Sequence, residues 1–217
     1  WGNDAGEAFY ISSSSATDTQ TIEISVLTVD GSGNWNEETV ETQLSGNVQV
    51  PVLTPRGDLV VRCYRMENIT STDLVGQVYA YYDDTVVAGV PQTQAKILAH
   101  ILDGNQTRQL MYTIPSGYWG FLFRGETGAT RNFGTDEMDF AYMSRRVGRT
   151  FVTKKKLGVM TTGSSHYQDL RTFPDIIPAK TDLGLMVENV SSNNLSGWGT
   201  FFILLVTEER FNKLQNI

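Results

Sequence analysis

The sequence predicts an all-β protein. From Thr21 to Val206, short runs alternate apolar and polar residues, and each run closes in a turn rich in Gly, Asn, Asp or Ser. The run Thr21–Val26 reads Thr-Ile-Glu-Ile-Ser-Val, which is the period of two that a half-buried strand requires. A chain of 217 residues can form one large β-sandwich or two small ones. We expect a single antiparallel, jelly-roll-like sandwich over residues 1–217.

The first half of the chain contains the clearest hairpin. Residues 1–7 have no periodicity and predict an N-terminal arm. Ile22–Val29 and Thr39–Leu44 flank the turn Asp30–Asn34, whose glycines and Asn tolerate the positive φ of a tight connection. Pro51 indicates an edge strand, because proline cannot donate to a ladder. Further strands are expected at Ala8–Ile11, Val48–Val52, Leu59–Met66 (apolar on both faces and therefore central), Gln77–Tyr82 and Thr93–Leu102, where we prefer a strand to a helix.

The second half predicts a second hairpin, in which Pro115–Gly117 joins Gln109–Ile114 to Tyr118–Arg124. Two stretches rich in glycine and polar residues predict long loops, Gly125–Asp136 and Ser164–Pro174. The first of them is the only internal boundary that the sequence suggests, and its change in composition is mild, so we expect one domain. The remaining strands are expected at Met138–Arg145, Arg149–Thr153, Leu183–Glu188 and Trp198–Val206, followed by a tail, residues 208–217, that forms a short helix or an extended arm.

Composition disfavours two classes of partner. The chain has 17 Lys and Arg against 24 Asp and Glu, and this net charge of −7 repels nucleic acid at long range. No apolar run approaches the ~20 residues that cross a bilayer, so we expect no membrane partner. The single cysteine, Cys63, excludes an intrachain disulfide and is expected to be buried. The chain begins at Trp1 without a signal-peptide pattern, which suggests processing or preceding residues.

The residues do not predict an enzyme. His100 and His166 are the only side chains that titrate near neutral pH without a strong shift, and neither lies in a recognisable catalytic motif. Asp83–Asp84 and Asp136–Asp139 are rich in carboxylates but lack the ligand spacing of a calcium loop. We therefore expect no catalytic residue, no cofactor and no bound metal.

Two further features point to surfaces. Lys154, Lys155 and Lys156 form the one concentrated basic stretch of an acidic chain, and they would meet either solvent or an acidic protein surface. The tail presents Phe211, Leu214 and Ile217 as an apolar stripe, which would cover either a neighbouring chain or its own domain. Tryptophans beside turns would pack in a core or stack on sugars or a partner subunit; these are Trp35, Trp119 and Trp198.

Several stretches, in order, cover almost the whole chain and carry a family resemblance. They are Trp1–Asp4, Ser12–Thr19, Asp30–Val40 with Leu44–Gly46, Asp103–Thr107, Tyr112–Gly117 and Ile177–Leu183. On these stretches the chain resembles a family of virion structural proteins of tailed bacteriophages from aquatic habitats. The resemblance implies a β-sandwich that decorates or cements a capsid, or that lies elsewhere on the particle, and it implies an arm before Trp1.

The expected function follows from this resemblance. We expect a non-enzymatic structural protein on the capsid surface of a virion, with the major capsid protein and further copies of itself, as a trimer, for partners. Its candidate interface residues are Trp1, Lys154, Lys155, Lys156, Phe211, Leu214 and Ile217. A tail- or fibre-associated adhesion module that binds host surface glycans is the alternative, and a glycan-degrading virion hydrolase ranks third.

Overall fold

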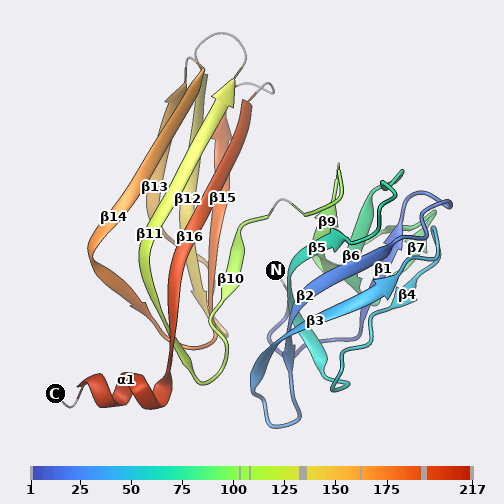
Figure 1. Cartoon of the computed structure of the whole chain (residues 1–217), viewed down its shortest axis with the longest axis horizontal. Coiled ribbons are helices and arrows are strands. Elements are labelled where there is room, and N and C mark those ends of the chain that lie inside the picture. The colour runs from blue at the N-terminus through green and yellow to red at the C-terminus, as the bar shows by residue number, and fades with distance from the viewer. Residues whose placement is uncertain are drawn as a thin grey trace. The chain divides into compact units, whose positions relative to one another are not determined.

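The chain forms antiparallel β-sheets in two compact units. A computed structural model describes residues 2–102, 104–107, 109–131, 136–161, 163–191 and 195–215. Unit 1 is Trp1–Gln109 and unit 2 is Leu110–Ile217. The all-β prediction is confirmed (Figure 1), and the one α-helix of the described residues is eight residues long. This division differs from the expected single domain. The sequence does not reveal it, because the polar segment before Leu110 has the same composition as the turns inside each unit.

Unit 1 consists of two sheets and a small hairpin. One sheet has the order β4-β1-β6-β9 and the other β3-β2-β5, and every strand pair is antiparallel. Both sheets contribute to one core, which includes Ile11, Ile24 and Met66. The strand bounds are β1 (Phe9–Ser13), β2 (Thr21–Val29), β3 (Trp35–Gln43), β4 (Val50–Pro51), β5 (Leu59–Asn68), β6 (Val78–Tyr82), β7 (Val86–Val87), β8 (Val90–Pro91) and β9 (Ile97–Ile101), and a 3-10 turn, Gln94–Lys96, precedes β9.

The strongest local patterns of unit 1 form as predicted. Strands β2 and β3 pair without interruption from Thr21 opposite Gln43 to Val29 opposite Trp35. The Asp30 carboxylate fixes their turn by accepting the backbone N–H groups of Ser32 and Asn34. Pro51 lies on the edge strand β4, as expected, and the preferred strand over Thr93–Leu102 is present as β9.

The sequence suggested a central position for strand β5, but this strand lies at the edge of its sheet. It is apolar on both faces because each face is buried against a different cluster. Val60, Cys63 and Met66 belong to the core between the sheets, whereas Val61 packs with Leu27 and Trp35 on the opposite face. Burial raises the pKa of the Cys63 thiol, in agreement with the expected buried position.

The N-terminal segment is anchored to its own unit rather than free, which corrects the expected arm. The side chain of Arg62 is fully buried, and its Nη2 lies 2.6 Å from the Asp4 carboxylate. Its Nη1 donates to the carbonyls of Asn3 at 3.0 Å and Val61 at 2.6 Å. The Tyr82 hydroxyl donates to Val61 O and accepts the Asn3 N–H, each at 3.1 Å. The buried Arg62 charge, the Tyr82 hydroxyl and three backbone groups therefore hold Asn3 and Asp4 in place.

A second buried carboxylate connects two loops of unit 1. Asp18 is fully buried, and it accepts hydrogen bonds from the Ser13 hydroxyl at 2.6 Å and from the backbone N–H groups of Val75 and Gly76, each at 2.9 Å. Three donors satisfy the charge that burial would otherwise make costly. The end of β1 and the start of β6 are held together in this way.

Unit 2 is formed from longer strands in two sheets that share a core (Figure 1). The four-stranded sheet has the order β10-β15-β12-β13, and the three-stranded sheet has the order β14-β11-β16. Phe140 and Tyr142 from the first sheet pack with Leu122, Ala129 and Phe201 from the second. The bounds are β10 (Met111–Thr113), β11 (Tyr118–Arg131), β12 (Asp136–Arg146), β13 (Val152–Thr161), β14 (Ser164–Ile177), β15 (Thr181–Val190), β16 (Leu195–Thr207) and α1 (Glu208–Gln215).

Three expectations for this unit are wrong. Pro115–Gly117 does form a turn, but β10 pairs with β15 and β11 pairs with β14 and β16, so the two arms do not form a hairpin. Most of the loop predicted at Gly125–Asp136 is the second half of β11, and residues 132–135 lie outside the described residues. The loop predicted at Ser164–Pro174 is strand β14. In β11 the outward positions include Glu126 and Gly128, whereas Thr127 faces the core and is buried.

A buried ion pair closes one end of the four-stranded sheet. Asp182 on β15 accepts the Thr113 hydroxyl at 2.6 Å and lies 2.7 Å from Nε and 2.6 Å from Nη2 of Arg145 on β12. The guanidinium also lies over the ring of Phe151, 5.2 Å from its centroid. Both guanidinium nitrogens contact the same oxygen, Oδ2, and Thr113 donates to Oδ1, so this charge-assisted contact joins three strands.

We predict that Arg62→Ala destabilises unit 1 by about 3 kcal/mol, because it removes the buried guanidinium that binds the Asp4 carboxylate and the Asn3 carbonyl. Arg65→Ala, on the same strand, should cost less than about 1 kcal/mol, since its ion pair with Glu67 is exposed. Native-state hydrogen exchange of the β1 and β5 amides measures unit 1 separately from unit 2. Equal losses in the two variants would contradict the assigned role of Arg62.

Candidate interaction surface

The candidate site is the outer face of the three-stranded sheet, which is the face turned away from the core of unit 2. Along β11, Leu122, Thr127 and Ala129 point inward and are buried, and on β16 Phe201 and Ile203 point inward and are partly buried. A register shift between Leu122 and Arg124 sets this alternation. The outer face consists of the neighbouring positions Phe121, Arg124, Glu126, Gly128, His166, Gln168, Ile176, Trp198, Phe202 and Leu204.

Two aromatic rings meet over a glycine at the upper part of this face. Gly128 pairs with His166 on one side and with Trp198 on the other. The two rings are stacked, with centroids 5.3 Å apart and planes 21° apart. A Cβ atom at Gly128 would lie 2.5 Å from the indole, so only glycine allows Trp198 to lie this close to the sheet. The indole is nevertheless 43% exposed, which leaves an aromatic surface for a partner.

A polar cluster adjoins the two rings. The Glu126 carboxylate accepts a hydrogen bond from Gln168 Nε2 at 2.7 Å and forms an ion pair with Arg124. His166 Nε2 lies 3.9 Å from the same carboxylate, so protonation of the imidazole would add a second cation. The Arg124 guanidinium covers the Phe202 ring at 4.8 Å from its centroid. Charged groups and exposed rings therefore alternate within one short stretch of the face.

Large apolar side chains continue the face toward the opposite end of β16. Ile176 and Leu204 are each 53% exposed and lie in one row on either side of Phe121, and Phe202 is 43% exposed. Contiguous exposed apolar surface on a folded domain marks an interaction site more often than an inert surface. The sequence carried a signal for it, since Trp198, Phe202 and Leu204 occupy the solvent-facing positions of a strand that is apolar on both faces.

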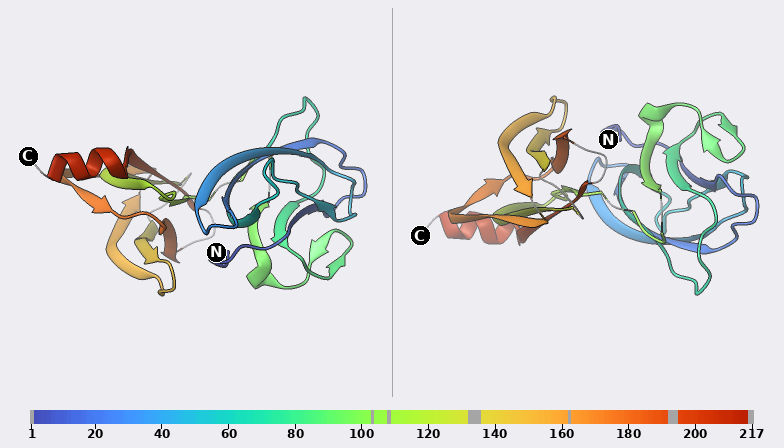
Figure 2. Two further views of the ribbon diagram at one scale, coloured as in Figure 1. Left: turned by 90° about the horizontal axis from the view of Figure 1, so that it is seen from below. Right: turned by 90° about the horizontal axis from the view of Figure 1, so that it is seen from above.

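The C-terminal tail folds back on its own unit, so Phe211 is not a free contact for a neighbour. Phe211 is buried, with its ring stacked on Trp119 at a centroid distance of 4.3 Å and tilted against Phe121 at 5.9 Å. Figure 2 shows helix α1 on the side of the three-stranded sheet away from the second sheet. Of the two forms expected for the tail, a short helix or an extended arm, the structure has the helix, and it covers the end of the outer face.

Of the other candidate interface residues at the two ends of the chain, only Leu214 lies within the described residues. Leu214 is 61% exposed, and with Leu204 and Val206 it lines a shallow apolar pocket of about 420 Å³ beside Arg210 and Lys213. It therefore remains available to a partner. Trp1 and Ile217 lie outside the described residues.

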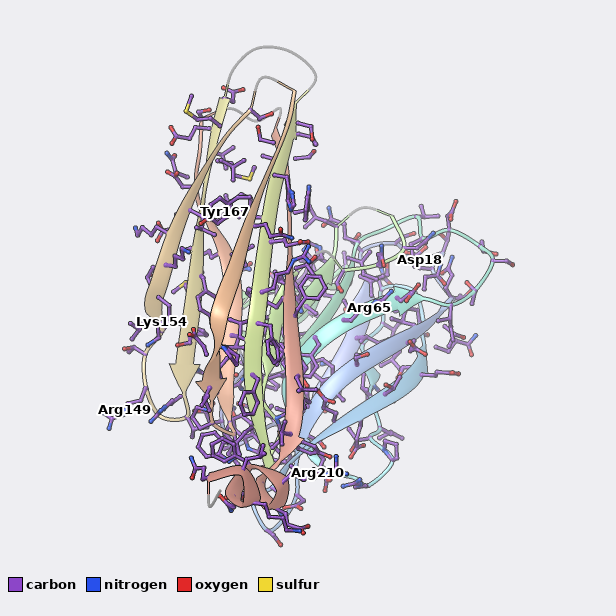
Figure 3. All side chains as sticks on the ribbon, turned by 60° about the vertical axis from the view of Figure 1, so that its left-hand side comes forward. Asp18, Arg65, Arg149, Lys154, Tyr167 and Arg210 are labelled. Carbon is purple, nitrogen blue, oxygen red and sulfur yellow. The ribbon has the colours of Figure 1, made fainter. Side chains whose placement is uncertain are left out.

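The three lysines of β13 face different surroundings. Lys154 is exposed near Arg149 at one end of the strand (Figure 3). Lys155 is half-buried and lies over the Tyr167 ring, 5.7 Å from its centroid. Lys156 pairs with Glu188 at 2.6 Å on the neighbouring part of the sheet. The basic stretch is therefore not one continuous patch.

The other histidine and the other two tryptophans named from the sequence pack against neighbouring side chains. His100 stacks on Tyr79 with centroids 4.3 Å apart, and partial burial lowers its pKa. Trp35 is buried beneath the Arg62 guanidinium, which lies 5.2 Å from its centroid, and Trp119 supports Phe211. Within the described ranges, no group of three or more His, Cys, Asp or Glu side chains is placed to hold a metal ion.

Comparison of the chain with protein-family models, with curated proteins and with solved structures finds no match. In the part of the chain that the structure describes, no helix has the length and apolar character to cross a membrane.

We predict that Phe211→Ala releases helix α1 from the sheet, because the buried ring is its main apolar contact and a Phe→Ala change in a core costs about 3–5 kcal/mol. The expected result is loss of hydrogen-exchange protection over residues 208–215 with little change in β12 and β15. Leu214→Ala, one turn later on the exposed side, is the matched control and should keep α1 protected. Retained protection in Phe211→Ala would contradict the assigned anchor.

Proposed function

We propose that this chain is a non-enzymatic structural protein of a tailed-bacteriophage virion, which binds the capsid surface as a decoration or cement protein. The observation that carries the proposal is the outer face of the β14-β11-β16 sheet, where Trp198, Phe202, Leu204 and Ile176 are about half exposed. Such a surface suits a large, partly apolar protein partner such as the major capsid protein. The family resemblance of the turn sequences supports the same assignment.

The architecture fits this role. In unit 1 two antiparallel sheets enclose one main core cluster, and in unit 2 two antiparallel sheets enclose two adjoining clusters; this layering favours a β-sandwich, for which we propose the jelly-roll kind. A rigid sheet presents its side chains in a fixed pattern, so little conformational entropy is lost when a partner covers them. Many copies on one shell then add modest contacts through multivalency, and a shell is reinforced without any chemical step.

We further propose that the protein acts as a symmetric oligomer, a trimer if it occupies three-fold positions of the shell. A closed ring engages three identical neighbours at once. The outer face and Leu214 are the parts of unit 2 that we assign to contacts with copies of the chain or with the capsid. Phe211 has a different role, since it holds α1 against the sheet.

A tail- or fibre-associated adhesion module that binds host glycans is the second candidate. One specific arrangement favours it. Trp198 offers an exposed ring beside the hydrogen-bonding groups of Glu126, Gln168 and His166. An aromatic platform with polar groups at its rim suits a sugar, whose ring has one apolar face and a border of hydroxyls.

The decoration proposal predicts that Phe202→Ser combined with Leu204→Ser weakens binding to capsids lacking this protein by at least about tenfold, since central apolar contacts dominate interfaces. Leu53→Ser combined with Val75→Ser, which changes exposed apolar residues of unit 1, should bind like the unaltered protein. Co-sedimentation with capsids gives the affinities, and light scattering gives the oligomeric state. A monomer that does not bind capsids would refute the decoration role.

The adhesion alternative makes a separate prediction. If glycans are the partner, Trp198→Ala should abolish retention on an array of host surface glycans, because it removes the ring that stacks on the sugar. Phe202→Ser combined with Leu204→Ser should retain it. Glycan binding that depends on Trp198, together with absence of capsid binding, would favour the adhesion module over the cement protein.

A further inference from the structure

A pocket that shares only Ile176 with the outer face lies at the end of unit 2 where β12 turns into β13. Its volume is about 470 Å³, and its walls come from β12, β13, the end of β14 and the start of β15. The size is within the range of small-molecule and side-chain binding sites. All of its lining residues belong to unit 2, so its shape depends on this unit alone.

Three cations surround this pocket. Arg146 ends β12, Arg149 lies in the turn and Lys154 lies on β13. Lys154 reaches the pocket because β13 has one extra residue here: Tyr142 pairs with Lys155, and Met143 pairs with Thr153. Figure 3 shows Arg149 and Lys154 at the same end of the unit. The pairing irregularity thus concentrates charge that a regular strand would distribute over two faces.

The three cations carry no counter-charge of their own. Among the described residues, no carboxylate lies within ion-pair distance of Arg146, Arg149 or Lys154, whereas the neighbouring Arg145 and Lys156 are paired with Asp182 and Glu188. Asp175 is the one carboxylate that lines the pocket. The pocket therefore has three positive charges and one negative charge. The positive charges repel one another, and a bound anion would reduce that repulsion.

The other walls indicate what the anion is attached to. Val152, Ile177, Pro178 and Leu183 provide apolar surface, and hydroxyl groups of Ser144, Thr150 and Thr181 lie among them. The arginine fork binds the two oxygens of a carboxylate or phosphate at once, and Lys adds a point charge. A ligand with an oxyanion at one end and an apolar body at the other would match both kinds of wall.

We propose that this pocket binds an organic oxyanion, a carboxylate or phosphate group joined to an apolar body, with Arg146, Arg149 and Lys154 as the anion ligands. The binding does not depend on the outer face, and it stands whether or not the protein decorates a capsid. The anion can come from a free small molecule or from an acidic side chain of a protein segment, and the two sources share the same recognition chemistry.

Chemical-shift titration of the full chain tests this proposal with three probes: inorganic phosphate, phenyl phosphate and the blocked dipeptide acetyl-Leu-Glu-amide. We expect shifts at the amides of residues 146–154 and tighter binding of phenyl phosphate than of inorganic phosphate, because the apolar walls add contact area. Tighter binding of the dipeptide than of phenyl phosphate would assign the pocket to a protein segment, and the reverse order would assign it to a small molecule.

Substitutions provide the decisive comparison. Arg149→Gln and Lys154→Gln should each weaken binding of the preferred probe by at least about tenfold, because each variant loses a hydrogen bond to a charged group. Lys156→Gln removes the same charge from the same strand but outside the pocket and should bind normally. Equal weakening by all three variants, or no shift with any probe at millimolar concentration, would overturn the proposal. Each variant lies on the surface, and its amide spectrum reports whether it has folded.

Discussion

Burial of one face of every sheet is the constraint on which the rest of the structure depends. Each strand alternates its side chains with a period of two, so the choice of inward residues fixes the outward ones. In unit 2, packing Leu122, Ala129 and Phe201 into the core leaves Trp198 and Phe202 on the opposite face. The candidate interaction surface is therefore a direct consequence of how the core is filled, with no loop or flexible element required to present it.

The fold was predictable where the signal is local. Alternation and turn chemistry identified the β2–β3 hairpin, and Pro51 identified an edge strand. Prediction failed where a long-range contact decides the outcome. Gly128 is typical of a turn, yet it lies within β11 because the Trp198 indole packs on it. Pro115–Gly117 is a genuine turn, but pairing of β10 with β15 depends on residues some seventy positions away, which no local pattern reveals.

The charged residues fall into two groups with different physical roles. Arg62, Asp18 and Asp182 are buried, and each is surrounded by partners that satisfy its hydrogen-bonding capacity. Removing a partner from such a group is costly, so these residues specify the positions of chain segments. Arg149 and Lys154 are exposed and carry no such partners within the described residues, so they remain free to engage another molecule. From the sequence alone all five are simply charged residues, and the buried ones cannot be distinguished from the exposed ones.

The irregular strand β13 has a consequence for the behaviour of the protein at high concentration. It is the outermost strand of its sheet, and a long outermost strand offers its free N–H and C=O groups as a template for strands of other molecules. The extra residue at Lys154 interrupts that row of groups, and the exposed ammonium group of Lys154 repels a second copy of the same strand. This edge is thereby protected against aggregation through β-sheet extension.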